Sequence, residues 1–332
     1  MNPPTPPLLE VKNLVVEFPS RRGTLRALDD ISFAIAPGEI LGVVGESGAG
    51  KSLTGAAIIG LLEPPGRVAG GQILLGGQRI DHLDHAQMRH IRGRRIGAIF
   101  QDPLTSLNPL YTVGQQLIET ILAHLPVSAA QARQRAIDLL GDTGIPAPAQ
   151  RIDHYPHQFS GGMRQRQGNH HALALAAEPQ LIVADEPTTA LDVSIQAQII
   201  QLLKSVCHAR GAAVMLITHD MGVIAETCDR VAVLYAGRIA EIGPVHEVIN
   251  HPAHPYTVGL MAAIPDMAQD RERLNQIDGA MPRLNAIPPG CAFHPRCPRA
   301  FDRCTAQRPD LLSAGATQAA CWLHAAPPEV RA

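Results

Sequence analysis

One loop in the first fifth of the chain has the residue types needed to hold a polyphosphate. Gly45 and Gly50 are separated by four residues, and Lys51 and Ser52 follow directly. Glycines let backbone N–H groups turn toward an anion, and a helix starting at Lys51 would present its positive end. Lys51 can reach the β- and γ-phosphates, and Ser52 can coordinate magnesium. The pattern predicts a nucleoside triphosphate site formed by Gly45, Glu46, Ser47, Gly48, Ala49, Gly50, Lys51, Ser52 and Leu53.

A second candidate site follows the apolar run from Leu181 to Ala184, which ends in Asp185 and Glu186. An aspartate after a buried strand holds magnesium in enzymes with this type of phosphate loop, and the next carboxylate can orient or deprotonate the attacking water. An acidic pair after a strand is, taken alone, more often a solvated loop. Together with the glycine loop, it predicts hydrolysis of the nucleotide.

The elements expected to position these residues are short apolar runs alternating with helical patterns. Strands that alternate with helices favour an α/β fold with a largely parallel sheet. The pattern becomes helical after residue 51, over 112–144 and over 193–209, and the stretch from about 103 to 178 is expected to form a helical lobe. Strands are expected at 8–18, 31–35, 40–44, 72–75, 96–100, 181–184, 213–217 and 230–234.

Four further short segments stand in a fixed order along the chain. They are Phe100-Gln101-Asp102-Pro103, Ser160-Gly161-Gly162-Met163-Arg164-Gln165-Arg166, Thr189-Ala190-Leu191-Asp192 and Ile217-Thr218-His219-Asp220. This set resembles the Q-loop, signature motif, D-loop and switch histidine of the ABC ATPase family. Phe18 resembles the aromatic residue that stacks on adenine in that family. Taken singly, His219 would be a surface or packing residue, and Phe18 would be a core residue.

The resemblance implies a P-loop ATPase core over residues 8–250, with a mainly parallel sheet, an antiparallel β subdomain and a helical subdomain. It also implies that two such subunits enclose two ATP molecules, each bound by the phosphate loop of one chain and the signature motif of the other. The roles it implies are catalytic for Glu186, His219 and Gln101, magnesium binding for Ser52, Gln101 and Asp185, and nucleotide binding for Ser160, Gly161, Gly162 and Asp192.

Three segments resemble one branch of this family, the dipeptide and oligopeptide importers. They are residues 100–109, the motif His254-Pro255-Tyr256-Thr257 with Gly259-Leu260, and residues 290–298. Importers of nickel and of glutathione share much of this pattern. The resemblance implies transport of a short peptide or similar solute that other subunits bind. The implied partners are a second ATPase subunit (a copy or a paralogue), two transmembrane permeases and an extracytoplasmic solute-binding protein.

The composition of the 332 residues fits this interpretation. Hydrophobic residues make up 45% and aromatic residues 3%, so a large, mainly aliphatic core is expected. The formal charge of −2 gives no reason to expect nucleic acid as a partner. The N-terminus lacks the pattern of a secretory signal, and no apolar run approaches the ~20 residues of a spanning helix. We expect a peripheral protein at the cytoplasmic face of the bacterial inner membrane.

Four of the six cysteines gather near the C-terminus, with spacings of five, six and sixteen residues. Four thiolates suit zinc or an iron–sulfur cluster, although the paired two-residue spacing of a zinc ribbon is absent. A proline-rich extension over 251–332 with four reduced cysteines is the simpler alternative. The family resemblance points to a [4Fe–4S] cluster held by Cys291, Cys297, Cys304 and Cys321. We expect these cysteines, rather than a large core, to hold the extension together.

One segment departs from the family pattern. After Arg166 the chain reads Gln167-Gly168-Asn169-His170-His171, where the family has an apolar helix face. Gly and Asn are poor helix formers, and buried polar groups cost stability unless paired. A tolerated bulge, a short self-correcting frameshift and weakened activity are all compatible with it. The histidines at 154, 157, 170 and 171 are expected to be solvated.

Two other classes of function compete with transport. A soluble ABC ATPase acting on DNA, ribosomes or cluster assembly is one, but the chain has no sustained heptad repeat and only one phosphate loop. A catalytically inactive regulatory subunit is the other, and the intact Lys51, Asp185, Glu186 and His219 argue against it. The sequence leaves open the transported solute, the choice between identical and paralogous ATPase partners, and the role of the cysteines.

Overall fold

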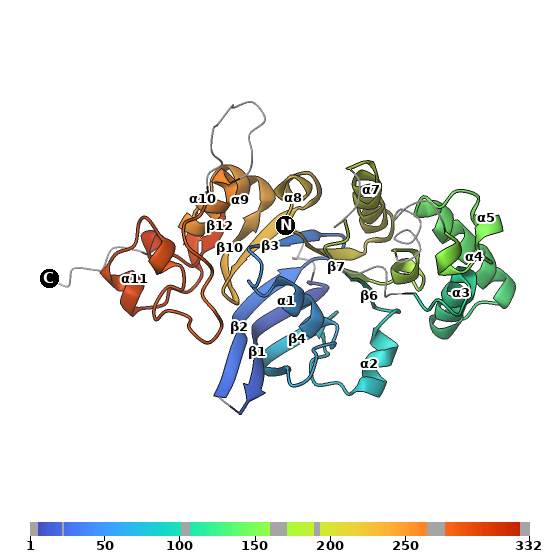
Figure 1. Cartoon of the computed structure of the whole chain (residues 1–332), viewed down its shortest axis with the longest axis horizontal. Coiled ribbons are helices and arrows are strands. Elements are labelled where there is room, and N and C mark those ends of the chain that lie inside the picture. Colours follow the sequence, from blue (N-terminus) through green and yellow to red (C-terminus); the bar gives the residue numbers. More distant parts are fainter. Residues whose placement is uncertain are drawn as a thin grey trace.

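The computed structural model describes residues 6–21, 23–100, 107–159, 171–188, 193–263 and 276–325. Its main sheet has parallel strands at the centre and at one side, and antiparallel strands at the other side (Figure 1). The predicted α/β fold is therefore confirmed. In spatial order the strands are β11 (Leu312–Ala314), β12 (Thr317–Ala319), β10 (Arg238–Pro244), β9 (Arg230–Tyr235), β3 (Ile40–Val44), β8 (Ala213–Ile217), β7 (Leu181–Asp185) and β6 (Ile96–Ile99).

A second, antiparallel sheet lies against one face of the main sheet. Its order is β2 (Gly23–Ile35), β1 (Leu9–Ser20), β4 (Arg67–Leu75) and β5 (Gln78–Arg79). Helix α1 (Lys51–Ile58) lies between the two sheets (Figure 1), and α2 (His85–Ile91) packs nearby through Met88 and Ile91. This is the antiparallel β subdomain that the family resemblance implied.

Side-chain alternation along the central strands divides the core into two layers. In β8, Ala213, Met215 and Ile217 face the layer shared with the antiparallel sheet. Val214 and Leu216 face the opposite layer, which includes α7 (Val193–Arg210), α8 (Met221–Thr227) and α9 (Val245–Asn250). Both faces of β8 are buried, as expected for a strand inside a parallel sheet. The loops that carry polar side chains therefore emerge at the strand ends.

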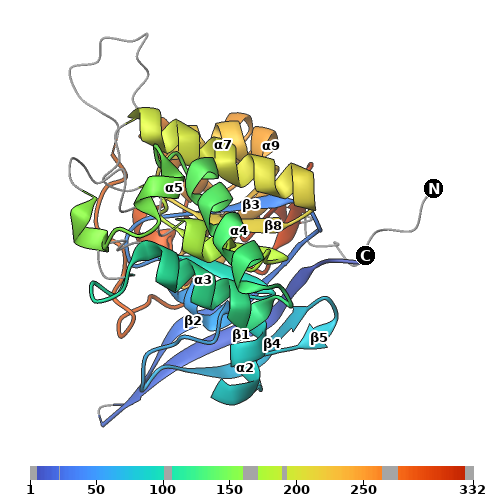
Figure 2. The same ribbon diagram turned by 90° about the vertical axis from the view of Figure 1, so that its right-hand side faces the viewer.

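Three helices form a lobe at one end of the long axis (Figures 1 and 2). They are α3 (Val113–His124), α4 (Ala129–Asp142) and α5 (Pro148–Arg151), followed by the 3-10 turn η1 (Pro156–Gln158). Thr112 and Ser128 begin α3 and α4 with reciprocal side-chain caps to Gln115 and Gln131. Such caps satisfy N–H groups that a helix start leaves unpaired.

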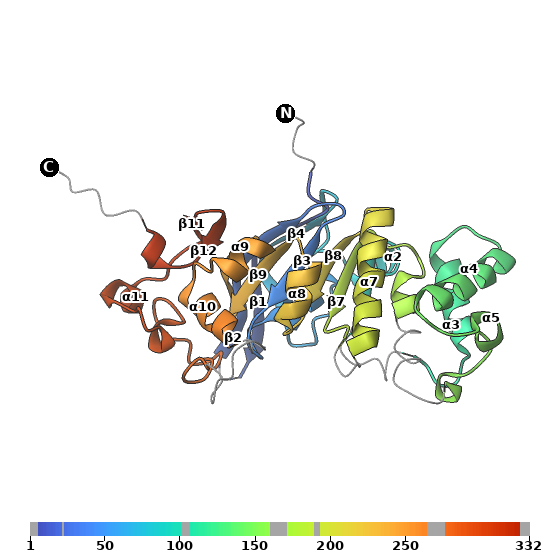
Figure 3. The same cartoon turned by 90° about the horizontal axis from the view of Figure 1, so that it is seen from above.

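The segment after residue 250 lies at the opposite end of the long axis (Figures 1 and 3). It contains α10 (Pro255–Ala262), η2 (His294–Arg296), α11 (Asp302–Ala306), the β11–β12 hairpin and η3 (Trp322–His324). Strand β12 pairs with β10, and Tyr256 and Phe293 belong to the main hydrophobic core. We expected the cysteines, rather than a large core, to hold this extension, but the extension shares the main core of the chain. Sheet pairing and apolar packing join it to the rest of the chain.

A buried carboxylate fastens the extension to β10. Glu241 is 0% exposed, and its carboxylate accepts the N–H groups of Ala253 and His254, each at 2.9 Å. The hydroxyl of Thr317 donates to the same carboxylate at 3.3 Å. Hydrogen bonds from three partners compensate the cost of burying a carboxylate.

Candidate functional site: a phosphate loop and an acidic strand end

The predicted phosphate loop connects β3 to α1, as the sequence indicated. Gly45 has a φ of 147° and Gly50 a φ of 104°, conformations that side-chain-bearing residues rarely adopt. A Cβ atom at Gly45 would collide with the carbonyl oxygen of Leu234 in the neighbouring strand β9. Only glycine therefore lets the loop fold over the end of the sheet and start α1 at Lys51.

The loop forms one wall of a cavity of about 600 Å³. Ala49 does not line it, because its side chain is buried, and its N–H donates to the carbonyl of Glu46 at 3.1 Å. Sequence reasoning missed Ala27, Val44, Met221, Leu260 and Leu284, which also line the cavity. The predicted residues that do so are Phe18, Gly45, Glu46, Ser47, Gly48, Gly50, Lys51, Ser52, Leu53, Glu186 and His219.

Lys51 is held at the base of the loop. Its Nζ donates to the carbonyl oxygens of Gly45 at 2.8 Å and Glu46 at 3.1 Å. Burial lowers the pKa of Lys51, and the nearby Glu186 and Asp185 oppose that shift. A buried ammonium facing two carboxylates is suited to binding an anion that reaches the loop.

Ser52 and Asp185 bring two oxygen ligands together from different elements. The Ser52 hydroxyl, in the first turn of α1, donates to Asp185 Oδ1 at the end of β7 at 3.0 Å. Burial raises the pKa of Asp185, while the hydrogen bond from Ser52 lowers it. A hydroxyl and a carboxylate beside a polyphosphate pocket are the hard oxygen ligands that magnesium prefers. The donor set therefore fits magnesium.

Glu186 and His219 meet because β7 and β8 are adjacent and parallel. Glu186 Oε1 lies 3.3 Å from His219 Nδ1, and the Glu186 N–H donates to the carbonyl of Ile217 at 2.8 Å. Glu186 has a φ of 49°, a left-handed backbone conformation that is uncommon for a glutamate. The carboxylate and the imidazole border the same cavity as Lys51, so an acid–base pair lies beside the anion site.

Five predicted site residues lie outside the described residues: Gln101, Ser160, Gly161, Gly162 and Asp192. The unusual segment falls outside them too, except for its last residue. His171 is 1% exposed, so the expectation that it is solvated was wrong. Residues 171–175 are helical, and the apolar neighbours Ala172 and Leu175 enter the main core.

The four C-terminal cysteines lie near one another as free thiols. Burial raises the pKa of Cys291 to about 11 and also raises that of Cys321. The backbone N–H groups of Phe293 and Leu323, each two residues further on, lower these pKa values in opposition. Across the described part of the chain, no three His, Cys, Asp or Glu side chains are grouped to hold a metal ion.

The parallel sheet, the glycine loop and the acid at the end of β7 define a P-loop ATPase. The chain belongs to the ABC transporter family. The family pattern described as ABC transporter matches residues 28–189, and that described as oligopeptide/dipeptide transporter, C-terminal region, matches 240–304. Within the described residues, no helix is long and apolar enough to cross a membrane.

Curated relatives match along almost the whole chain. The dipeptide transport ATP-binding protein DppD of Escherichia coli (strain K12) is 47% identical over 315 residues, which are 95% of this chain and 96% of that protein. A putative peptide import ATP-binding protein of Brucella abortus (strain 2308) is 44% identical over 96% of this chain and 95% of its own length. A dimeric ATP-binding cassette bound to ADP and Pi has a TM-score of 0.64 and 28% identity, covering 71% of this chain and 98% of its own.

Proposed function

We propose that this chain binds and hydrolyses ATP to energise the import of dipeptides, oligopeptides or a similar small solute. The observation that carries the proposal is that Lys51, Ser52, Glu186 and His219 line one cavity, where Ser52 also binds Asp185. The 47% identity to a dipeptide transport ATP-binding protein supports the class of solute. The C-terminal family match supports the same class.

In the proposed mechanism, Lys51 exchanges its two carbonyl partners for the β- and γ-phosphate oxygens of ATP. Ser52, Asp185 and Gln101 would hold magnesium, whose positive charge would neutralise charge on the phosphates. Glu186 orients the attacking water and accepts its proton, and His219 contacts the γ-phosphate. Phe18, on β1 at the rim of the cavity, stacks on the adenine.

The proposal includes a composite site made by two ATPase subunits. Ser160, Gly161 and Gly162 contact the ATP bound to the partner subunit, and Asp192 lies at the same junction. Two permeases receive the helical subdomain, about residues 103–178, of the 8–250 nucleotide-binding domain. An extracytoplasmic solute-binding protein delivers the solute, and the chain works at the cytoplasmic face of the bacterial inner membrane.

The first test replaces the proposed base. Glu186→Gln keeps the size of the side chain but removes the proton acceptor, so it is expected to bind ATP, dimerise and stop turning over. Sedimentation with Mg-ATP and phosphate release from the full transporter measure both effects. Glu226→Gln, an exposed change on α8, is the matched control. Unchanged turnover in Glu186→Gln would show that Glu186 is not the base.

We propose further that Cys291, Cys297, Cys304 and Cys321 hold a [4Fe–4S] cluster. The proximity of the thiols and the N–H groups directed at Cys291 and Cys321 support this, because such hydrogen bonds tune cluster sulfurs.

Purification without oxygen tests the cluster. We expect a brown chain with visible charge-transfer absorption, equimolar iron and acid-labile sulfide, and loss of both in Cys297→Ser. Cys207→Ser changes a buried thiol outside the extension and is the control. A colourless chain that contains zinc would overturn the proposal.

A further inference from the structure

The carboxylate of the phosphate-loop residue Glu46 is held by an arginine of the extension. Arg296 Nη1 donates to Glu46 Oε2, and Arg296 Nη2 donates to Glu46 Oε1, both at 3.0 Å. The two residues are 250 positions apart in sequence. The Arg296 side chain is 7% exposed and that of Glu46 is 27% exposed. The pair is therefore a two-pronged, largely desolvated ion pair at the nucleotide cavity.

The extension fixes the Arg296 guanidinium independently of Glu46. Its Nε donates to the carbonyl of Asp278 at 2.8 Å, and Nη2 donates to that of Ile277 at 3.3 Å. The guanidinium carbon also lies 5.8 Å from the ring centre of Tyr235 and 5.9 Å from that of Phe293. A planar group held from several sides presents its remaining N–H bonds in a set direction.

The main chain of Glu46 is held by the same extension. The Glu46 N–H donates to the Tyr256 hydroxyl at 2.9 Å. Tyr256 is 0% exposed and packs against Tyr235 and Phe293, with ring centres 4.6 and 5.4 Å away. The motifs around Tyr256 and Arg296, which resembled peptide importers in sequence, thus converge on one phosphate-loop residue.

We infer that Arg296 is a positioning residue for the nucleotide site, through which the extension controls the affinity for ATP. This inference rests on the proposed function. Arg296 neutralises the Glu46 carboxylate and holds it in place, so the loop meets the triphosphate without an unpaired negative charge. Because the pair is poorly exposed, solvent and salt screen that charge weakly. Arg296 acts through Glu46 and does not need to contact the nucleotide.

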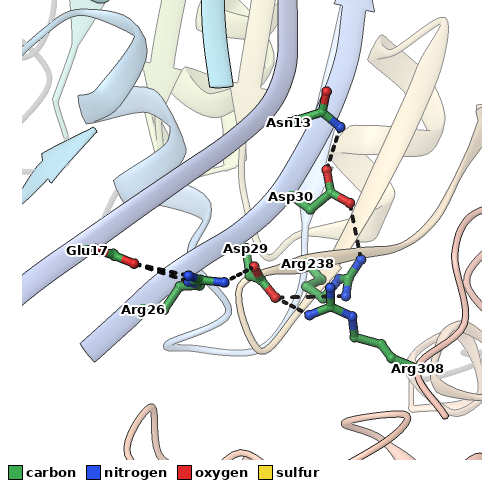
Figure 4. A network of polar contacts seen from close by, with 7 residues as sticks. All are labelled: Asn13, Glu17, Arg26, Asp29, Asp30, Arg238 and Arg308. Atoms are coloured by element: carbon green, nitrogen blue, oxygen red, sulfur yellow. Dashed lines mark hydrogen bonds and ion pairs between the residues drawn. The ribbon is translucent and has the colours of Figure 1, made fainter. Parts of the chain in front are cut away.

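A second arginine joins the extension to a different part of the molecule, as Figure 4 shows. Arg308 forms an ion pair with Asp29 of β2. Asp29 also contacts Arg26 at 3.0 Å and Arg238 at 3.9 Å. Neither Arg308 nor Asp29 lines the nucleotide cavity. Arg308→Gln is therefore a matched control, since it removes an arginine–carboxylate contact of the same extension outside the nucleotide cavity.

The experiment measures the Kd of the full chain for a fluorescent Mg-ATP analogue, together with KM and kcat of the assembled transporter. Arg296→Gln is expected to weaken binding about tenfold and to raise KM more than it lowers kcat. Arg308→Gln is expected to bind within about twofold of the wild type. The double variant Glu46→Gln/Arg296→Gln is expected to recover most of the lost affinity, because the unpaired carboxylate is gone.

Wild-type affinity in Arg296→Gln would overturn the inference. So would a double variant as weak as Arg296→Gln, because that result assigns the loss to the fold of the extension. If Arg296→Gln does not fold, Arg296→Lys keeps the charge but loses the two-pronged contact and should bind about threefold more weakly. Unchanged affinity in Arg296→Lys would then overturn it. A wild-type chain that binds no ATP would instead reject the proposed function itself.

Discussion

The two ends of the molecule are attached to the nucleotide-binding centre in different ways. The extension reaches the phosphate loop through Arg296 and Tyr256, and it pairs with the main sheet through β12. The hydrogen bonds described for α3, α4 and α5 join these helices to one another, to adjacent turns and to residues 176–178. Both ends share the main apolar core. Directional polar bonds fix an orientation, whereas apolar packing tolerates small displacements, so the extension end is expected to be the more rigidly held.

The largest expected effect comes from the centre to which both ends are attached. Lys51→Ala removes the ammonium that lies under the phosphate loop and is expected to reduce ATP turnover on the order of 100- to 1000-fold. Phosphate release from the assembled transporter measures it. Lys204→Ala, a change on α7 whose ammonium binds the carbonyl of Glu226, should leave turnover near the wild-type rate. Comparable losses in both variants would remove the special role of Lys51.

Removing the Glu241 carboxylate, which binds the extension to β10, is expected to have the next largest effect. Glu241→Ala leaves the N–H groups of Ala253 and His254 and the hydroxyl of Thr317 without their acceptor in a buried site. We expect a loss of about 3 kcal/mol in the free energy of unfolding, measured in urea. Weaker ATP binding should accompany it, because Arg296 depends on the same extension. A stable variant with normal affinity would contradict the rigid attachment.

Low pH is expected to destabilise the extension through protonation of His254. Burial and, to a smaller extent, the nearby His324 lower the pKa of the His254 imidazole to about 4, and a backbone hydrogen bond with Ala320 opposes that shift. The His254 Nδ1 accepts the N–H of Tyr256. The unfolded chain takes up the proton below about 6.5, so stability is lost as the pH falls from about 6.5 to about 4. The difference between the unfolded and folded pKa values lowers the free energy of unfolding by about 3 kcal/mol at full protonation and by about 2 kcal/mol at pH 5.

Urea unfolding between pH 7 and pH 5 measures this loss. His254→Asn retains a side-chain acceptor at the start of α10 but does not titrate in this range, so its stability should fall less steeply. Equal slopes in the wild type and in His254→Asn would show that His254 is not the group responsible.

The smallest effect is expected at the helical end. Ser128→Ala removes the hydroxyl that caps α4 and should cost about 1 kcal/mol of unfolding free energy. Its Kd for Mg-ATP should equal that of the wild type, because no described bond carries the change from α4 to the phosphate loop. A higher Kd for Mg-ATP in Ser128→Ala would mean that the helical end is coupled to the nucleotide site as firmly as the extension is.

Local patterns in the sequence were enough to predict the site's framework. Glycine spacing and apolar runs fixed the phosphate loop, and β3 and β8 have the predicted bounds. The contacts of Glu46 could not be predicted in this way, since its partner Arg296 lies 250 residues away and looks like any charged residue in a proline-rich segment. The burial of Glu241 could not be predicted for the same reason. The groups that donate to its carboxylate, which include the Ala253 N–H and the Thr317 hydroxyl, come from two separate segments of the chain.

The pairing of β12 with β10 also determines which strand edge of the main sheet is exposed on that side. Without the extension, β10 would be an outer strand with unpaired N–H and C=O groups at Glu241 and Ile242. An exposed strand edge is a template for pairing with another chain. The extension therefore covers that strand edge. Cutting the chain at residue 250 would leave the cassette both short of its phosphate-loop contacts and prone to self-association.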